Sequence, residues 1–459
     1  MPELGSRGCP ARMNGVRACY NAVFAGGFLA LSPYYFLRLV RRGGWRSGFG
    51  QRWGRYGELL KRRPSRPPLV WMHAVSVGEV NVALALLETL RERLPDRAWL
   101  MSTTTTTGMA ELERKLPPDV DRIYYPIDWR SCVRRALAAF PPQAFILLEA
   151  EIWPNFLWEL ADRGVPAFLV NARMSDRSSR RYGRFGPLFR PLFAGFRGVG
   201  VQNRADAERL RALGVRDAAL RITGNLKFDA ACRPMRPGVD APALLRALGV
   251  APGAPILVAG STHAGEEAIL AEACGRLRGR FPDLFLVLVP RHFERGGDVS
   301  RELAARGVRF VRRTEIGDPP RPAHGPLSCL LVDTTGELTR FYAAADLVFV
   351  GKSLTAEGGQ NPIEPGGLGK AMVFGPHMEN FAAIAQAFLQ GGGAVQVRDA
   401  AELERVLGEL LADPRRCQIL GERAQAVVES NRGAVARTAE MILEGLRGDT
   451  GRHRSATAG

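Results

Sequence analysis

The chain has 459 residues, of which 46% are hydrophobic, so it is long enough for two domains that each bury an ordinary core. Its seven cysteines are scattered and include no CxxC pair, which argues against a disulfide framework or a structural zinc site. The formal net charge is +17, and residues 1–68 alone hold 13 Lys and Arg residues against two acids, which indicates either a nucleic-acid arm or a membrane-surface segment.

The first predicted element is residues 18–37, ACYNAVFAGGFLALSPYYFL, which carry no charge over 20 positions. A helix of this length is about long enough to cross ~30 Å of hydrocarbon, although Asn21, Ser32 and Pro33 make it a weak span. Arginines flank it on both sides, as is typical of a membrane-associated segment. We expect residues 1–68 to form a membrane anchor with a basic collar, either spanning the bilayer or lying in its interface. An ordinary buried helix is the alternative.

Residues 61–68, KRRPSRPP, indicate a linker, after which short apolar runs alternate with helical patterns such as 79–93 and 129–139. This alternation is typical of βα units and a parallel sheet. The predicted strands are 69–73, 97–102, 122–125, 143–149, 166–171 and 198–201, then 255–259, 284–289, 329–332, 346–350, 371–374 and 394–397. We therefore expect two doubly wound α/β domains, 69–235 and 236–446, followed by a polar tail at 447–459.

Polar motifs follow the predicted strands repeatedly, at the sheet edge where doubly wound folds bind ligands. Each motif alone could be a turn or a helix cap, but their number indicates a binding site in each half. The segments are HAVSVGEV, EAEIWPN, NARMSDRSSRRY, GSTHAGEE, PRHFER, DTTGEL and GKSLTAEGGQNPIEP.

Four charged residues in or near these motifs admit two interpretations each. Glu79 is either a first-turn carboxylate that stabilises a helix dipole or a general base. Glu149 ends an apolar strand, where a carboxylate is costly to bury unless it is paired or belongs to a site. Lys227 is either a solvated lysine or a contact to phosphate, and Arg291 suits a nucleotide phosphate or base.

Several other polar residues receive plainer interpretations. The histidines His263, His292 and His377 lack metal-type spacing, so we expect them to be hydrogen-bonding walls of a site. Residues 102–108, STTTTTG, indicate a strand end followed by a helix cap. We expect Asp333 to cap a helix that begins near residue 336. Residues 358–370, GGQNPIEPGGLGK, contain five glycines and two prolines and predict a rigid loop that holds a ligand.

Taken together and in order, these motifs resemble those of the 3-deoxy-D-manno-octulosonic acid (Kdo) transferases of lipopolysaccharide synthesis. The resemblance covers nearly the whole chain and rests on HAVSVGE (73–79), EAEIWPN (149–155), NARMSDRSSRRY (171–182), GNLKFD (224–229), GSTHAGEE (260–267), PRHFER (290–295), DTTGEL (333–338) and NPIEP (361–365). It implies a GT-B fold, in which two Rossmann-like domains face each other across a cleft. The acceptor would bind the N-terminal domain, and the nucleotide sugar would bind the C-terminal one.

The resemblance also implies a reaction, namely transfer of Kdo from CMP-Kdo to lipid IVA with release of CMP. It implies Glu79 as the general base and Glu149 and Lys227 as stabilisers of the transition state. The implied donor-binding residues are Pro290, Arg291, Thr335, Gly336, Glu337, Asn361, Pro362, Ile363 and Glu364. No cofactor or metal is expected, and the partners would be the two substrates and the cytoplasmic face of the bacterial inner membrane, not nucleic acid.

Three positions depart from the family pattern, which usually has His at Gln360, Gly at Lys352 and often Met at Thr335. These departures bear on donor contacts. The rival interpretations are a GT-B transferase or epimerase that uses a UDP-sugar, since fold alone does not decide the substrate, and a non-enzymatic membrane-associated binding protein. No local motif sets the number of Kdo residues transferred or the oligomeric state.

Overall fold

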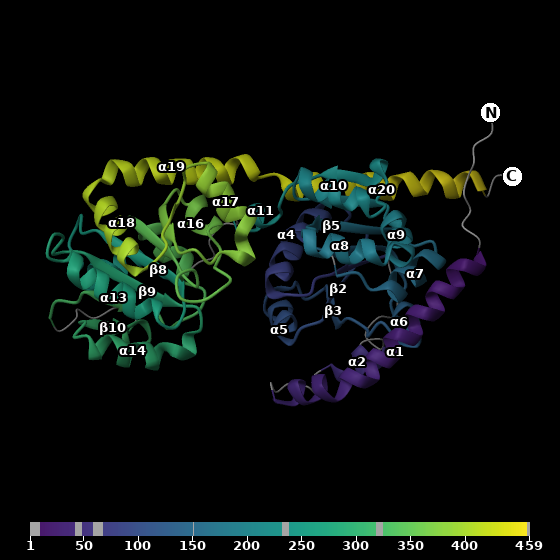
Figure 1. Cartoon of the computed structure of the whole chain (residues 1–459), viewed down its shortest axis with the longest axis horizontal. Coiled ribbons are helices and arrows are strands. Elements are labelled where there is room, and N and C mark those ends of the chain that lie inside the picture. Colours follow the sequence, from purple (N-terminus) through teal and green to yellow (C-terminus); the bar gives the residue numbers. More distant parts are fainter. Residues whose placement is uncertain are drawn as a thin grey trace. The chain divides into compact units, whose positions relative to one another are not determined.

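A computed structural model describes residues 10–41, 48–57, 68–149, 151–231, 238–317 and 325–456. Contacts divide the chain into two compact units, one of Met1–Ala230 with Gly433–Gly459 and the other of Ala231–Arg432. Each unit has a seven-stranded parallel sheet with helices on its faces, which confirms the predicted pair of doubly wound domains (Figure 1). All of the predicted linker except Pro68 lies outside the described residues.

The first sheet has the strand order β3-β2-β1-β4-β5-β6-β7, and every neighbouring pair is parallel. The order reverses between β1 and β4, and ligands in doubly wound folds bind beyond the carboxyl ends of the strands at such a switch point. The strands are β1 (Leu69–His73), β2 (Ala98–Thr103), β3 (Asp121–Tyr124), β4 (Pro142–Leu148), β5 (Ala167–Ala172), β6 (Gly198–Val201) and β7 (Leu220–Ile222).

Alternate residues of these strands enter two separate hydrophobic clusters, because successive side chains of a strand point to opposite faces. In β1, for example, Trp71 belongs to one cluster and Met72 to the other, and both are fully buried. The helices of this unit are α1 (Pro10–Arg41), α2 (Phe49–Arg52), α4 (Val77–Arg93), α5 (Thr106–Lys115), α6 (Arg130–Ala139), α7 (Pro154–Asp162), α8 (Asp176–Arg184), α9 (Gly186–Gly195), α10 (Arg204–Ala212), α11 (Lys227–Ala231) and α20 (Ala434–Ala456).

The C-terminal helix α20 corrects the predicted domain boundary. We expected residues up to 446 to belong to the second domain and 447–459 to form a tail. Instead α20 continues to Ala456, and its buried residues Ile442 and Leu443 pack in the cluster that holds Met72 of β1 (Figure 1). The sequence could not predict that α20 packs on the first unit, because the pattern of an amphipathic helix does not indicate which sheet the helix covers.

The second sheet has the order β10-β11-β9-β8-β12-β13-β14, again with parallel neighbours and a switch point between β8 and β12. Its strands are β8 (Ile256–Thr262), β9 (Phe285–Pro290), β10 (Phe310–Arg312), β11 (Cys329–Leu331), β12 (Leu347–Val350), β13 (Ala371–Phe374) and β14 (Val395–Gln396). Its helices are α12 (Ala241–Ala247), α13 (Glu266–Leu277), α14 (Gly296–Ala305), α15 (Leu338–Ala344), α16 (Ile363–Gly367), α17 (Ala382–Gln390), α18 (Ala400–Ala412) and α19 (Pro414–Asn431).

All twelve predicted strands are present, and their ends agree within two residues except at β8, which ends three residues later than predicted. The prediction missed β7 and β10, which are the outermost strands of their sheets. Each has three residues and includes an arginine, and none of their side chains is fully buried. Edge strands of this kind lack the continuous apolar run that marks a buried parallel strand.

The uncharged N-terminal segment is helical, as expected, and lies within the longer helix α1. Figure 1 shows α1 (purple) along the first unit. In the part of the chain that the structure describes, no helix combines the length and the apolar character that crossing a bilayer requires.

Candidate active site

The switch point of the first sheet brings both predicted catalytic carboxylates to one edge. Strand β1 ends at His73 and leads into α4, whose first turn holds Glu79. Strand β4, the neighbour of β1, ends at Leu148 and is followed at once by Glu149. The two motifs that follow these strands therefore meet where the fold leaves the carboxyl ends of its strands open to a ligand.

Glu79 is held in one position by the start of its own helix. Ser76 is the N-cap residue of α4, and its hydroxyl accepts a hydrogen bond from the backbone N–H of Glu79 at 3.3 Å. In return, the Glu79 carboxylate accepts from the Ser76 hydroxyl and from the backbone N–H of Val75, each at 3.0 Å. This arrangement resembles a capping box, so the structural interpretation of Glu79 holds. The same carboxyl also lines a cavity, so the catalytic interpretation stays open.

The environment of Glu79 raises the pKa of its carboxyl to about 7 from an ordinary 4.5. Burial is the main cause, and the negative charge of Glu149 adds to it, whereas the hydrogen bonds from Val75 and Ser76 pull the pKa down. A carboxyl with a pKa near neutrality is well matched to taking a proton from a hydroxyl at physiological pH.

Glu149 and Lys227 meet across the sheet edge. The Nζ of Lys227 lies 3.4 Å from Oε1 of Glu149, and both side chains are partly exposed, at 24% and 30%. Lys227 begins α11, and the backbone N–H of the preceding Leu226 donates to Oδ1 of Asn171 at 3.1 Å. Asn171 of β5 thus fixes the segment that carries the lysine. The structure brings together the three residues that the sequence assigned to catalysis.

A cavity of about 710 Å³ opens in front of these carboxylates. Its wall combines acidic, cationic, hydroxyl and aromatic side chains, which is a suitable lining for a charged sugar. The lining residues are Tyr20, Val75, Glu79, Glu149, Glu151, Ile152, Trp153, Pro154, Arg173, Ser175, Ser178, Arg181, Tyr182 and Phe189.

Sequence reasoning did not single out several of these wall residues. Arg173 and Arg181 lie in the NARMSDRSSRRY motif, which was recognised only as a whole. Tyr20 comes from α1, more than 50 residues before the nearest other lining residue, and nothing in the sequence linked it to a site. Fully buried His73 lies behind the wall, with Nε2 3.6 Å from Oε2 of Glu151. Burial lowers the pKa of His73, although Glu151 opposes this shift.

Strained backbone marks the strand ends of both units. Four residues other than glycine have left-handed conformations, at a cost of about 1–3 kcal/mol each, and such residues cluster at functional sites. Each lies at the carboxyl end of a strand, and they are Glu149 (φ 56°), Asn171 (φ 52°), Ser261 (φ 57°) and Lys352 (φ 54°). Glycine adopts this conformation freely, which gives a physical reason for the glycine usual at position 352 in the resembled family.

Glu266 organises the switch point of the second sheet. Its fully buried carboxylate accepts the backbone N–H groups of His263, Lys352, Ser353 and Leu354 at 2.7–3.0 Å. The loops after β8 and β12 are thereby held together. Glu266 lies in the GSTHAGEE motif, and no role for it was predicted. A buried acid at a strand-to-helix turn was the available signal.

The predicted donor residues lie at the carboxyl edge of this second sheet. Pro290 ends β9, and the backbone N–H of exposed Arg291 donates to the Thr262 carbonyl at 3.0 Å. Thr335 and Gly336 are exposed in the turn before α15. Glu337 follows them, and its carboxylate is paired with Arg313 at 3.2 Å and accepts from the hydroxyl of Thr334.

The loop at 358–370 contains a short helix, so the prediction of a loop throughout was wrong. Helix α16 covers Ile363–Gly367, and the Asn361 side chain holds its first turn, accepting from the Ile363 N–H at 3.1 Å and donating to Glu364 at 3.2 Å. Pro362 and Ile363 are buried, so their side chains support the loop from inside. Asn361 and Glu364 stay partly exposed, and the Glu364 carboxylate also accepts from the Thr339 hydroxyl at 3.2 Å.

Asp333 does not cap α15, contrary to expectation. Its carboxylate accepts the backbone N–H and the hydroxyl of Thr314 at 3.0 and 2.7 Å and pairs with Arg312 at 2.7 Å. It therefore ties the end of β11 to the segment after β10, a strand that the prediction missed. The expected cap within 102–108 is confirmed, since Thr105 is the N-cap residue of α5.

The three site histidines differ in their surroundings. The rings of His263 and His292 lie 5.7 Å apart, whereas His377 is partly exposed and pairs with Glu379 at 3.4 Å. Within the described ranges, no group of three or more His, Cys, Asp or Glu side chains is arranged to hold a metal ion.

The raised pKa of Glu79 predicts a pH dependence of stability. As the pH rises from 4.5 to about 7, Glu79 ionises in the unfolded chain before it ionises in the folded one, so folding stability falls across this window. Between pH 5 and 7.5, the free energy of unfolding should fall in both proteins, by roughly 1–3 kcal/mol more in the wild type than in Glu79→Gln. Urea unfolding at the two pH values measures this, and Glu92→Gln on the exposed side of α4 controls for the lost charge. An equal loss of stability in Glu79→Gln and the wild type would contradict the assignment.

Comparison with known proteins agrees with the geometry. The family model of 3-deoxy-D-manno-octulosonic-acid transferases (Kdo transferases) matches residues 47–230. A 3-deoxy-D-manno-octulosonic acid transferase of Bordetella pertussis is 35% identical over 440 residues, which are 93% of this chain and 99% of the relative. Another from Haemophilus influenzae is 31% identical over 91% of this chain and 94% of the relative.

A solved structure supports the fold alone. UDP-GlcNAc 2-epimerase from Neisseria meningitidis, bound to UDP-GlcNAc, matches with a TM-score of 0.55 at 11% identity, covering 82% of this chain and 99% of that one. This likeness shows a GT-B type of architecture. Because the match to the Bordetella pertussis relative is 35% identical over almost that entire protein, the chain belongs to the family of 3-deoxy-D-manno-octulosonic acid transferases.

Proposed function

We propose that this protein is a glycosyltransferase that moves Kdo from CMP-Kdo to lipid IVA and releases CMP in lipopolysaccharide synthesis. One observation carries the proposal beyond family membership. A buried carboxyl with a pKa raised to about 7, Glu79, faces a cavity of about 710 Å³ that the paired Glu149 also lines. Such a group has the protonation behaviour of a general base at neutral pH.

In the proposed reaction, Glu79 takes the proton of an acceptor hydroxyl while that oxygen attacks the anomeric carbon of Kdo. The bond from this carbon to the phosphate oxygen breaks, and its electron pair leaves with CMP. Hydrogen bonds from Val75 and Ser76 fix the carboxylate, so little reorganisation is needed at the moment of proton transfer.

Glu149 and Lys227 supply opposite charges for the same step. A sugar that loses a phosphate develops oxocarbenium-like positive charge, which the Glu149 carboxylate would stabilise. The departing phosphate gains negative charge, which the Lys227 ammonium would stabilise. Because the two groups already form a 3.4 Å ion pair, their charges are held in place before the reaction begins.

The remaining cavity wall suits lipid IVA, an anionic amphiphile with a glucosamine disaccharide. Arg173 and Arg181 offer guanidinium groups to phosphate, and Ser175 and Ser178 offer hydroxyls to sugar oxygens. Trp153 and Tyr182 give flat apolar surfaces to a sugar ring. A cavity lined by both acidic and cationic side chains offers different groups to the reacting hydroxyl and to the charged ends of such an acceptor.

The donor would bind the second unit, at the edge organised by Glu266. Arg291 would contact the phosphate of CMP, and the partly exposed Glu364 carboxylate would accept from the ribose hydroxyls. The proposed chemistry assigns the phosphate charge to cationic side chains and not to a metal. Transfer that continues at an unchanged rate in EDTA would support this assignment, and transfer abolished by EDTA would overturn it.

Lipid IVA lies in a membrane, and we propose that α1 brings the protein to that surface by lying in the interface of the cytoplasmic leaflet. The outer side of α1 exposes Val23, Leu29, Leu31, Tyr34 and Leu37 by 54–69%. The N-terminal 68 residues also carry most of the net positive charge, which attracts an anionic leaflet.

Charged substitutions on this outer side test the membrane proposal. The double variant Leu29→Glu, Leu31→Glu should bind vesicles of anionic phospholipid at least tenfold more weakly, because each change places a carboxylate against the lipid surface. Flotation of the full chain with vesicles measures the bound fraction, and Ile222→Glu, at an exposed site on β7, is the control. Equal binding of the double variant and the wild type would overturn the proposal.

The activity itself gives a direct prediction. The purified protein should release CMP from CMP-Kdo only when lipid IVA is present, and Glu79→Ala should lower kcat by about 10²–10⁴-fold, because a general base contributes on this scale. Coupled detection of CMP and the mass of the lipid product measure the reaction.

The controls separate the rival functions. Glu92→Ala, on the exposed side of α4, should retain full activity. Transfer from a UDP-sugar with CMP-Kdo inert would replace the proposed donor, and full activity in Glu79→Ala would remove the proposed base. A protein that binds both substrates without releasing CMP would be the non-enzymatic alternative.

A further inference from the structure

Helix α1 packs on the first unit along one side. The residues that are partly buried recur every three or four positions, which is the period of a single helix face. They are Val16, Arg17, Tyr20, Asn21, Phe24, Ala25, Phe28 and Ser32. A helix that only tethered the protein to a membrane would not need a continuous face against the catalytic unit.

The apolar part of this contact consists of edge-on aromatic rings. Tyr20 meets Trp158 of α7 edge-on, with ring centroids 5.6 Å apart. Phe24 and Phe28 meet Trp129, which precedes α6, at 6.4 and 6.1 Å. Aromatic contacts of this geometry hold two elements in a defined position beyond what burial alone provides.

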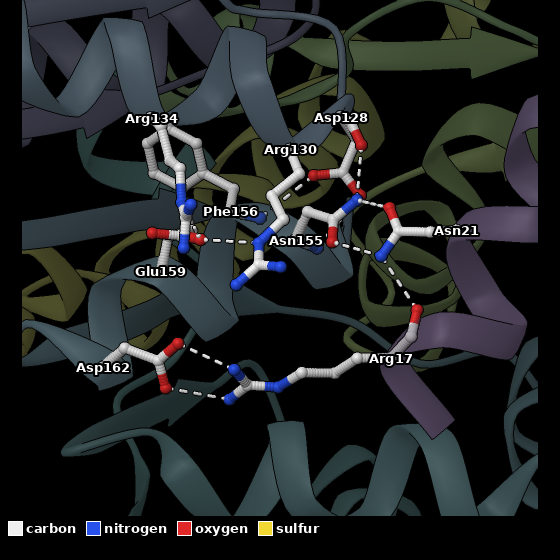
Figure 2. A network of polar contacts seen from close by, with 9 residues as sticks. All are labelled: Arg17, Asn21, Asp128, Arg130, Arg134, Asn155, Phe156, Glu159 and Asp162. Carbon is white, nitrogen blue, oxygen red and sulfur yellow. Dashed lines mark hydrogen bonds and ion pairs between the residues drawn. The ribbon is translucent and has the colours of Figure 1, made fainter. Parts of the chain in front are cut away.

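The polar part centres on Asp128, which is fully buried (Figure 2). Its carboxylate accepts three hydrogen bonds, from the Tyr20 hydroxyl at 2.8 Å and from the backbone N–H groups of Asn155 and Phe156 at 3.0 Å each. The Asn155 side chain also exchanges hydrogen bonds with Asn21 of α1, at 2.8 and 3.2 Å.

Asp128 therefore serves two elements at once. Trp153 is the N-cap residue of α7, and its side chain makes no capping hydrogen bond to any described residue. Asp128, from the loop before α6, instead accepts hydrogen bonds from the first N–H groups of α7. Its remaining capacity goes to Tyr20 of α1. Losing one donor to a buried carboxylate is costly, because the charge is then left incompletely satisfied.

Both elements line the cavity in front of Glu79. Tyr20 comes from α1, and Trp153 and Pro154 come from the start of α7. The one carboxylate that fixes Tyr20 also fixes the residues directly after Pro154. A shift of α1 away from the unit would therefore change the cavity wall at two places.

We propose that α1 forms a wall of the acceptor cavity and that Asp128 is a positioning residue, which makes acceptor binding depend on the docked state of α1. The proposal rests on the proposed function, since it takes this cavity to be the lipid IVA site. The same helix, α1, would then contact the membrane surface on one side and line the site of the lipid substrate on the other.

Tyr20→Phe is the sharpest variant, because it removes one hydroxyl and keeps the ring against Trp158. It should raise the KM for lipid IVA about three- to tenfold and leave the KM for CMP-Kdo unchanged. Amide hydrogen exchange should become faster both in residues 18–24 of α1 and in residues 153–157 at the start of α7. Asp128→Asn should act in the same direction and more strongly, since three donors lose a carboxylate.

The matched control is Asp162→Asn, which removes a different hydrogen-bond partner of α1. Asp162 pairs with Arg17 at 2.7 Å, but it is 43% exposed and does not line the cavity. This variant should leave the KM for lipid IVA and the exchange of residues 153–157 near wild-type values, because exposed ion pairs contribute little.

Two results would overturn the inference. One is an unchanged KM for lipid IVA in Tyr20→Phe, and the other is an equal rise in the KM values of both substrates, which indicates general loosening. If the wild type releases no CMP in the presence of lipid IVA, the proposed function fails, and hydrogen exchange alone decides the structural inference. Unchanged exchange at 153–157 in Tyr20→Phe would then refute it, and faster exchange there would support it.

Discussion

The candidate site depends on a reversal of strand order between the neighbouring strands β1 and β4. From β1 the chain continues to β2 on one side of the sheet, and from β4 it continues to β5 on the other side. At such a point the segments that leave the two strands diverge, so the carboxyl ends are open to a ligand. Glu79 follows one of these strands and Glu149 follows the other. Lys227 lies at the same edge, although it is far along the chain from Glu79 and Glu149. The side chain of Asn171 in β5 accepts a hydrogen bond from the backbone of Leu226 and so holds the segment that carries Lys227.

The two acids at this edge have different surroundings. Burial and the charge of Glu149 raise the pKa of Glu79, and the donors Val75 and Ser76 limit the rise. Glu149 instead faces Lys227 and stays partly exposed. Two carboxylates of one cavity therefore have different environments, as a division into proton acceptor and charge stabiliser requires.

The sequence predicted the buried part of the fold well, because parallel strands covered on both faces leave continuous apolar runs. It missed β7 and β10 because edge strands of three residues carry no such run. It assigned α20 to the second domain because neither hydrophobic periodicity nor chain position reveals which sheet a helix covers. For the site, motif order predicted Glu79, Glu149 and Lys227, and the structure places them close together. Tyr20, Asp128 and Glu266 escaped notice because their roles depend on contacts between loops distant in sequence, which no local pattern encodes.

The proposed mechanism depends on Glu79 accepting the proton of the acceptor hydroxyl. Its most direct test is the pH dependence of kcat/KM for Kdo transfer to lipid IVA between pH 5 and 9, in the wild type and in Ser76→Ala. We expect a rising limb with a pKa near 7 in the wild type, because Glu79 acts as a base only when it is ionised. The limb should move to higher pH in Ser76→Ala, which loses a hydrogen bond that lowers this pKa. A rate independent of pH across this range, or a limb that stays in place in Ser76→Ala, would contradict this mechanism.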